Sequence, residues 1–355
     1  MNQTVYKRIV ISLIVALIAT TVVLLTIRLK PFDQTSLIPD VLLDEEVALD
    51  LSEEKQIAPF FFSTNTHMEG DWTQAASNLA FFKKQAGYLR TAMDYAQAYD
   101  AVLTFESEIP FAEGMLRFDD NVFQEALDRK MGIGSHCDIS PKIEFTDEEM
   151  TREFQKRKDA VDAVVDPLQN LGCSGGGGPS DWYTGAVGAG FKHLDGLVGY
   201  HYLAMSLSER PVGWTNREII KTYFHYPAPW EEEKRFYPIR VSASSFQEDS
   251  TGELVISGGS IGMLTALAEG IGCVTDCALT QGDVDILVEK VRDFAASRDT
   301  SRVAKMEVYI PSKTYSDPQI EYFFQELQKL QDEGVMQWAS QKTVYEAFVA
   351  WEQGT

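Results

Sequence analysis

Residues 9–27 are 19 consecutive uncharged, mostly apolar residues, and they constrain what this chain can become more than any other segment. At about 1.5 Å per helical residue the run is about 28 Å long, which nearly matches the hydrocarbon core of a bilayer. Basic residues flank it on both sides: Lys7, Arg8, Arg28 and Lys30. A cleaved signal peptide has a shorter apolar run and a small-residue cleavage site. We therefore predict an uncleaved anchor over residues 1–30, with one transmembrane helix at about 9–27.

Residues 31–57 are strongly acidic. Eight Asp and Glu residues are opposed only by Lys55, and the Leu and Val residues among them show no sustained period. We predict an acidic linker that lifts the following domain off an anionic membrane surface. Because basic residues flank both ends of the apolar run, orientation depends on a weaker argument. A single N-terminal anchor with a short basic head usually leaves its large domain outside the cytoplasm, so we expect a periplasmic or cell-surface domain, with a cytoplasmic one as the alternative.

The charge balance limits the partners of the protein. There are 31 Lys and Arg against 53 Asp and Glu in 355 residues, which gives a formal net charge of −22. Binding nucleic acid requires concentrated Lys and Arg to neutralise phosphates, so we predict no nucleic-acid partner.

From residue 58 onward, strand-like and helix-like segments alternate. Predicted strands are 59–66, 101–105, 131–136, 306–310 and 335–340, and a pair of strands is expected at 238–244 and 253–259. Predicted helices are 72–85, 120–130, 146–165, 180–190, 260–269, 317–333 and 343–351. Six to eight such units in series favour a parallel sheet closed into a barrel. The predicted fold is an α/β protein with a distorted (β/α) barrel over residues 58–355.

Several segments, in order, resemble the polysaccharide deacetylase (NodB-homology) family. The segments are AVLTF at 101–105, ALDRKMGIGSHCD at 126–138, GCSGGGGPSDWYTGAVGAGFKHLDG at 172–196 and VMQWASQKTVYEAF at 335–348. The resemblance covers about residues 58–351. It implies a distorted β/α barrel that hydrolyses N-acetyl groups on a glycan with the help of a divalent metal.

The sequence also departs from the family pattern in four places. Where the family has Thr-Phe-Asp-Asp-Gly, this chain has Thr-His-Met-Glu-Gly, so that Met68 replaces the base and Glu69 falls on the metal position. The second histidine of the family's His-x-x-x-His motif is Ser140 here. The Arg-x-Pro-Tyr turn is replaced by residues 173–178, and the late Leu-x-His motif by residues 310–311. These differences put the deacetylase reaction in doubt.

A metal site is still compatible with these residues. His67, Glu69 and Asp71 alternate, so they would share one face of a strand, and His136 and Asp138 repeat the spacing. We predict His67, Glu69 and His136 as ligands of zinc or a similar divalent ion, with Asp71 or Asp138 as a further ligand or base. In the alternative, His136 caps a strand and the acidic residues are solvated.

The carboxylates also suggest a second reaction, the hydrolysis of a glycosidic bond. Two carboxylates on opposite sides of the barrel opening can act as the acid and the base of that reaction. Glu106 is the candidate for this acid–base role, beside Glu69, Glu108 and Asp138. Aromatic rings can stack on sugar rings, and we predict four residues to contact the substrate: Trp72, Trp182, Tyr200 and His201. The other interpretation of the aromatic residues is that they belong to the core.

Four cysteines leave the redox state open. Cys137 and Cys173 end strands that would be neighbours, and Cys273 and Cys277 could close a small loop, if the compartment is oxidising. All four could instead be reduced and buried.

The predicted function is metal-assisted hydrolysis of an N-acetyl or related bond on a surface glycan by a membrane-anchored deacetylase-like protein. The first alternative is a catalytically degenerate barrel that binds glycan or joins protein partners in a polysaccharide or envelope assembly. The second alternative is a glycoside hydrolase.

Overall fold

The computed structural model describes residues 57–69, 72–140, 142–268 and 277–354. One ten-stranded sheet lies within them. Its strands are β1 Phe60–Met68, β2 Thr104–Ser107, β3 Gly132–Cys137, β4 Gly172–Gly175, β5 His193–Asp195, β6 Ile239–Val241, β7 Leu254–Ile256, β8 Ser260–Met263, β9 Ala304–Tyr309 and β10 Gln337–Trp338.

The strand order is β6-β7-β5-β4-β3-β2-β1-β9-β8, and β10 pairs with β1. The β6–β7 pair is antiparallel and the other strand pairs are parallel. Only residues 257–259 separate β7, the second strand of this order, from β8, the last, so one short segment links the two sides of the sheet. The N–H of Glu307 on β9 donates to Gly259 O at 2.9 Å across the closure. The sheet therefore curls into a distorted barrel, and the predicted α/β class with a mainly parallel sheet is confirmed.

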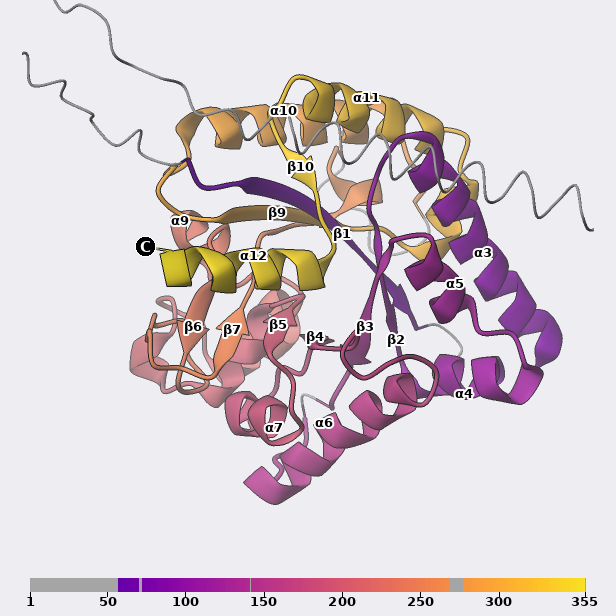
Figure 1. Ribbon diagram of the computed structural model, residues 1–355. Helices are drawn as coiled ribbons and strands as arrows, with labels where there is room; N and C mark the ends of the chain where they lie inside the picture. The colour runs from indigo at the N-terminus through magenta and orange to yellow at the C-terminus, as the bar shows by residue number, and fades with distance from the viewer. Residues whose placement is uncertain (1–56, 70–71, 141, 269–276, 355) are drawn as a thin grey trace, which may run out of the picture. The chain divides into compact units, whose positions relative to one another are not determined.

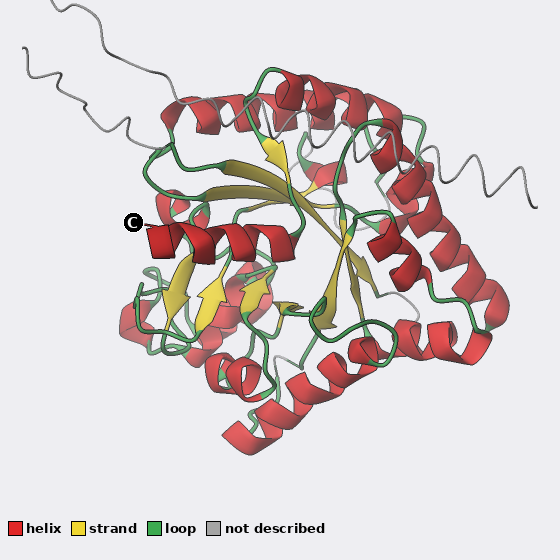
Figure 2. Ribbon diagram, in the orientation of Figure 1, coloured by secondary structure: helices red, strands yellow, loops and turns green. Residues whose placement is uncertain are grey.

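Helices surround this curved sheet, and the strands lie at the centre of the molecule (Figure 1, Figure 2). The helices are α2 Trp72–Ser77, α3 Leu79–Ala98, α4 Ile109–Phe118, α5 Val122–Asp128, α6 Asp147–Asp162, α7 Trp182–Gly188, α8 Asn216–Glu218, α9 Glu232–Arg235, α10 Gln281–Ser297, α11 Ile320–Asp332 and α12 Gln341–Gly354. Between β5 and β6 the chain makes a long excursion, residues 196–238, which contains mainly short helical turns.

Local sequence signals account for several helix boundaries. Thr146 caps α6 by accepting a hydrogen bond from the N–H of Glu149, whose side chain bonds back to Thr146 N. This capping box satisfies N–H groups that have no partner within the helix. Along α11, apolar side chains recur at helical spacing and are buried against the barrel: Ile320, Phe323, Phe324, Leu327 and Leu330.

Two predicted helices differ from the structure. The helix expected at 72–85 is two helices, because Asn78 caps a new one by accepting hydrogen bonds from Ala80 N and Phe81 N. The helix expected at 260–269 was wrong in its described part: residues 260–263 form β8, which pairs with β9, and Leu264–Ala266 is a 3₁₀ turn. Strand pairing at the barrel closure overrides local helix propensity there.

No helix among the described residues is long and apolar enough to span a bilayer. The predicted anchor at 9–27 and nearly all of the predicted linker lie outside the described residues.

Candidate active site

Three neighbouring strands bring four polar side chains to one place at their carboxyl ends. His67 lies near the end of β1 and Glu69 directly after it, Glu106 lies on β2, and His136 on β3. In the register of the parallel pairs, His67 is opposite Glu106, and Glu106 is opposite Gly134. Side chains alternate between the two faces of a strand, so His67 and Glu69 share the barrel-facing side while Met68 packs into the outer hydrophobic core.

Each of the four side chains contacts at least one of the others. His67 Nε2 lies 3.1 Å from Glu106 Oε2, and His136 Nε2 lies 3.2 Å from Glu69 Oε2. The two imidazole rings stack with centroids 3.9 Å apart. Tyr309, at the end of β9, donates its hydroxyl to Glu69 Oε1 at 3.1 Å. The structure thus brings together three predicted metal ligands, His67, Glu69 and His136, with the predicted catalytic residue Glu106.

Burial and mutual charges set the protonation of this cluster. Burial, together with the charge of His136, lowers the pKa of His67 to about 3, so its imidazole is neutral at neutral pH. Burial raises the pKa of Glu69, but the hydrogen bond and charge of His136 outweigh it and lower the pKa to about 2. For His136 the hydrogen bond that its ring donates to Glu69, together with the charge of Glu69, outweighs burial and raises the pKa. Burial and the neighbouring Asp195 raise the pKa of Glu106 well above its usual value.

The donor set fits a divalent cation. The ligand atoms of His67, Glu106 and His136 all lie within 4.8 Å of one another, and Glu69 contacts both histidines. His136 Nδ1 is buried and has no hydrogen-bond partner in the described part of the chain. Imidazole and carboxylate donors are the usual zinc ligands at about 2.0–2.2 Å, which places tetrahedral ligand atoms about 3.3 Å apart. His67 to Glu106 and His136 to Glu69 already have this spacing.

His67, Glu69 and His136 line a cavity of about 630 Å³. Its wall also includes the glycine-rich loop after β4 and parts of the excursion between β5 and β6. Besides the cluster, the polar and aromatic lining residues include Asn65, Asp138, Ser174, Tyr200, His225, Glu307, Tyr309 and Lys313. A cavity of this size holds one or two sugar rings, and it opens at the face where barrels of this kind carry their chemistry.

The remaining predicted catalytic residues are placed differently. Asp138 is exposed at the cavity wall, and its N–H donates to Glu108 Oε1 at 3.1 Å. Asp71 lies outside the described residues. Glu106 is 1% exposed, so it lies below the cavity mouth rather than on its rim.

The predicted sugar-contacting residues separate into two groups. Tyr200 is half-buried and lines the cavity, with its ring 5.7 Å from that of Phe224. Trp182 and His201 are fully buried, and Trp182 Nε1 donates to His201 O at 3.1 Å. Both side chains pack in the interior of this structure, and their predicted contact with a sugar stays a prediction. Trp72 is the first residue of α2.

Sequence reasoning missed several residues of the cavity. Tyr309 directly precedes the segment 310–311, where the family's late histidine is absent, and only its position at a strand end could have indicated it. Ser174, whose Oγ lies 3.0 Å from His67 Nε2, is hidden in the glycine run. His225 comes from the long excursion, which has no pattern that predicts a contact with the site.

The structure pairs Cys137 with Cys173, which the sequence left open. The two residues lie on adjacent strands beside His136 and Ser174, and both are fully buried. Cys277 is also disulfide-bonded, and Cys273, its expected partner, lies outside the described residues.

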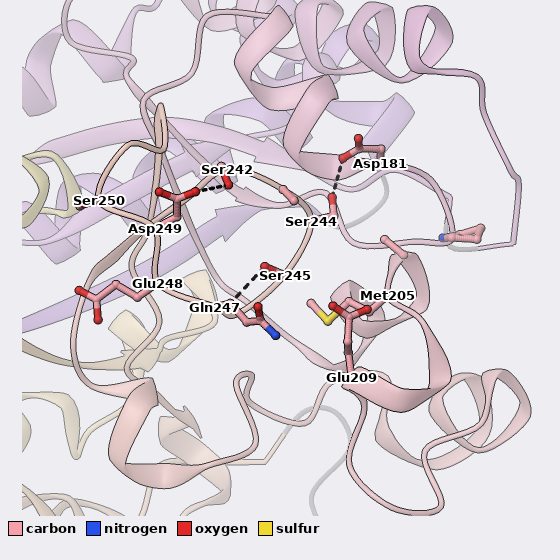
Figure 3. A pocket seen from close by; sticks show the side chains of 13 residues that line it. Asp181, Met205, Glu209, Ser242, Ser244, Ser245, Gln247, Glu248, Asp249 and Ser250 are labelled. Carbon is pink, nitrogen blue, oxygen red and sulfur yellow. Dashed lines mark hydrogen bonds between the residues drawn. The ribbon is translucent and has the colours of Figure 1, made fainter.

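A second cavity, of about 790 Å³, has no residue in common with the first. Serines and carboxylates of the β6–β7 connection line it (Figure 3). Asp181 there caps α7 and accepts hydrogen bonds from Ser244 and Thr184, and Ser242 donates to Asp249. These bonds stabilise the connection, and no histidine or cysteine lines the cavity.

The fold is an α/β barrel with a mainly parallel sheet, and a polar cluster lies at the carboxyl ends of its strands. Puue allantoinase has this fold: the alignment covers 82% of this chain and 91% of that one, with a TM-score of 0.50 and 9% identity. A protein from Mycobacterium smegmatis named as a polysaccharide deacetylase aligns over 84% of this chain and 95% of its own, at 9% identity and a TM-score of 0.49.

The 4-α-glucanotransferase of Thermococcus litoralis aligns over 82% of this chain but only 38% of its own length, at 11% identity and a TM-score of 0.47. No protein-family model matches the sequence, and no curated protein sequence matches it significantly. At these identities the likeness concerns the fold alone.

Proposed function

We propose that this protein is a carbohydrate-active hydrolase of the deacetylase type that cleaves an N-acetyl or related bond on a glycan with the help of a divalent cation. The supporting observation is that His67, Glu69 and His136 line one 630 Å³ cavity, while buried Glu106 lies within ligand distance of both histidines. A divalent cation in such a site lowers the pKa of a bound water and polarises a carbonyl oxygen.

The other residues of the cavity have distinct tasks in this proposal. Tyr309 holds Glu69 by a hydrogen bond and so fixes the orientation of that ligand. His225 is the residue that we assign to proton transfer, because it lines the same cavity and the family's late histidine is missing. Burial lowers the pKa of His225, so its imidazole is neutral at neutral pH and can accept a proton. Tyr200, with Phe224 behind it, offers a flat face to a sugar ring.

The glycoside hydrolase alternative receives less support. Its two carboxylates must flank the bond, about 5 to 9.5 Å apart. Glu106 is fully buried, so it is not available on one side of a bound glycan. The alternative of a non-catalytic barrel is supported by Met68 and Ser140, which stand where the family pattern has catalytic or metal-binding residues. Measuring the metal content of the purified protein distinguishes this alternative from an enzyme.

The site test uses the full chain, purified in detergent without chelators. We expect about one divalent ion per chain by elemental analysis, a rise in melting temperature on adding zinc, cobalt or nickel, and acetate release from N-acetylated oligosaccharides. Ser140→Ala is the matched control, because Ser140 is exposed and contacts none of the four ligands. A chain that contains no metal and whose melting temperature does not respond to these ions would contradict the proposal.

We further propose that the domain is tethered to a membrane by residues 9–27 and faces an oxidising compartment. The buried Cys137–Cys173 disulfide supports the second part, because disulfides persist mainly in such compartments. Reporter fusions after residue 355 test it: alkaline phosphatase should be active and a cytoplasm-dependent fluorescent protein dark, and the reverse pattern would refute the orientation.

A further inference from the structure

Trp230 is an exposed ring in a protein that covers its other aromatic side chains. It is 47% exposed, and every other Phe, Tyr and Trp whose exposure the structure describes is buried or half-buried. A single apolar side chain on a surface is ordinary and needs no explanation. Trp230 differs because it belongs to a group of aromatic rings on the excursion between β5 and β6.

Four rings form this group. The ring of Trp230 lies 5.3 Å from that of Trp214 and 5.6 Å from that of Tyr226, measured between centroids. Trp214 is buried and stacks on Tyr223 at 4.5 Å. The hydroxyl groups of Tyr223 and Tyr226, which are half-buried, form no hydrogen bond with the part of the chain that the structure describes. We call Tyr223, Tyr226 and Trp230 the aromatic surface.

Backbone contacts hold the aromatic surface in place. The N–H of Trp230 donates to the hydroxyl of Tyr202 at 2.7 Å, and the N–H of Gly199 donates to Tyr226 O at 2.8 Å. A Cβ at Gly199 would lie 1.9 Å from Tyr223 O, so glycine allows the two segments to pack this closely. Rings that are already fixed lose little conformational entropy when a ligand covers them.

The two segments that carry these contacts also form part of the cavity wall. Val198 and Tyr200 from the first segment and His225 from the second line the 630 Å³ cavity. Tyr226 directly follows His225, and Trp230 comes four residues later. Neither Tyr226 nor Trp230 lines the cavity itself. The aromatic surface is therefore built on the same segment as the cavity wall but lies outside the cavity.

The composition of the excursion indicates what kind of ligand fits this surface. Residues 196–238 contain five acidic and five basic residues, so their formal net charge is zero, whereas the whole chain carries −22. Nine of these 43 residues are Phe, Tyr or Trp, about twice the 11% of the whole chain. Fixed Tyr and Trp side chains combine a flat apolar face with a polar group that can form hydrogen bonds. A neutral ligand with flat faces and many hydroxyl groups, such as a sugar chain, matches both properties.

We propose that Tyr226 and Trp230 bind sugar units of a glycan chain that extends out of the cavity past His225. The inference rests on the proposed function, which supplies the glycan and the cavity in which it reacts. Because the cavity holds one or two sugar rings, a longer glycan must continue over the surface outside it. The substrate is then an oligomer or polymer that is longer than the cavity, and the aromatic surface gives the protein its preference for long chains.

The test compares the affinity for a short and a long chain. Titration calorimetry with the full chain uses the dimer and the hexamer of N-acetylglucosamine as probes, with a chelator present to prevent hydrolysis. Wild type should bind the hexamer more tightly than the dimer. Trp230→Ala should weaken hexamer binding about 5- to 30-fold, the usual cost of removing a central aromatic contact, and dimer binding less. Trp230→Phe keeps a flat ring and should lose less than the alanine variant.

Leu116→Ala is the matched control, because Leu116 is 57% exposed on α4 and does not line the cavity. It should bind the hexamer as wild type does. Hydroxyl-radical footprinting of wild type, read by mass spectrometry, tests the same contact without a substitution and so remains valid if Trp230→Ala does not fold. The hexamer should protect Trp230 from oxidation and leave Leu116 unprotected.

Three results would overturn the inference alone: equal affinity of wild type for dimer and hexamer, an unchanged hexamer preference in Trp230→Ala, or no protection of Trp230 by the hexamer. Protection that rises with protein concentration and not with the hexamer would also overturn it, and would assign the surface to a second copy of this chain. Wild type that binds neither oligomer would overturn the inference together with the glycan ligand of the proposed function. A chain that contains no metal but binds the hexamer through Trp230 would contradict the hydrolase and support the aromatic surface.

Discussion

His201 should make the protein sensitive to mild acid. The residue is fully buried, its Nδ1 accepts from Val198 N at 3.1 Å, and its Nε2 donates to Gly175 O at 3.1 Å. Both ring nitrogens of the neutral imidazole are therefore satisfied by backbone groups. Burial lowers the pKa of His201 to about 4, and the bonds to Gly175 and Val198 offset only part of this effect.

The size of the effect follows from the two pKa values. In the unfolded chain His201 titrates near 6.5, so between pH 6.5 and 4 the unfolded state binds more protons than the folded state. Stability is therefore complete above about pH 6.5, falls as the pH drops, and levels off below about pH 4. At pH 5 the loss attributable to His201 is about 2 kcal/mol, and its limit is about 3.4 kcal/mol.

Urea unfolding at pH 7 and pH 5, with a chelator present, measures this effect. His201→Gln should cost about 1–3 kcal/mol at pH 7, because a buried hydrogen-bonding group is replaced by one with different geometry. The variant should then lose about 2 kcal/mol less than wild type between the two pH values. Ser140→Ala, which changes no titrating group, should behave as wild type. An equal drop in wild type and His201→Gln would refute the reasoning, and unchanged stability with lost glycan binding would support the predicted sugar-contact role.

Three further predictions follow from the site and its surroundings. Glu69→Ala and His136→Ala should each abolish bound metal and hydrolysis but cost little stability, as elemental analysis, acetate release and thermal melting will show; retained metal in both would contradict the ligand assignment. Replacing Cys137 and Cys173 together by serine should cost about 3–4 kcal/mol in urea unfolding, because the disulfide closes a loop of 36 residues; an unchanged midpoint would contradict this. Lys305→Met should cost about 3–5 kcal/mol by leaving Glu307 buried and unpaired, and the double variant Lys305→Met/Glu307→Leu should recover most of it; a double variant as unstable as the single one would show that the pair is not the cause.

The sequence predicted those helices and strands whose positions depend on local patterns of apolar and capping residues. Alternating segments indicated the parallel-rich sheet, the Thr146 signal marked the start of α6, and the apolar spacing after Ile320 marked a core helix. Parallel strands align their carboxyl ends, so the positions of His67, Glu69 and His136 at strand ends were enough to predict that they meet.

The rest of the site depends on long-range packing that no local pattern records. Gln341 is separated from Asn65 by 276 positions, and only closure of the barrel brings them into contact. Trp182 and His201 are residue types that can stack on a sugar ring. Whether they are exposed depends on how residues 196–238 fold over α7, which the sequence pattern does not indicate. Strand pairing replaced the predicted helix at 260–269 for the same reason, since β8 is specified by β9 rather than by its own residues.

Strand alternation also explains how a polar site forms although the sequence departs from the deacetylase pattern that it resembles. Met68, at the position of the family's base, faces the outer core, where a charged group would be costly to bury. Asn65 and His67 on β1, and Glu69 directly after it, face the barrel: Asn65 donates to Asp195, and His67 and Glu69 belong to the polar cluster. The functional side chains are therefore expected at every second position of each strand, on the side that faces the barrel interior. Four further polar residues lie at such positions: Glu106, His136, Asp195 and Tyr309.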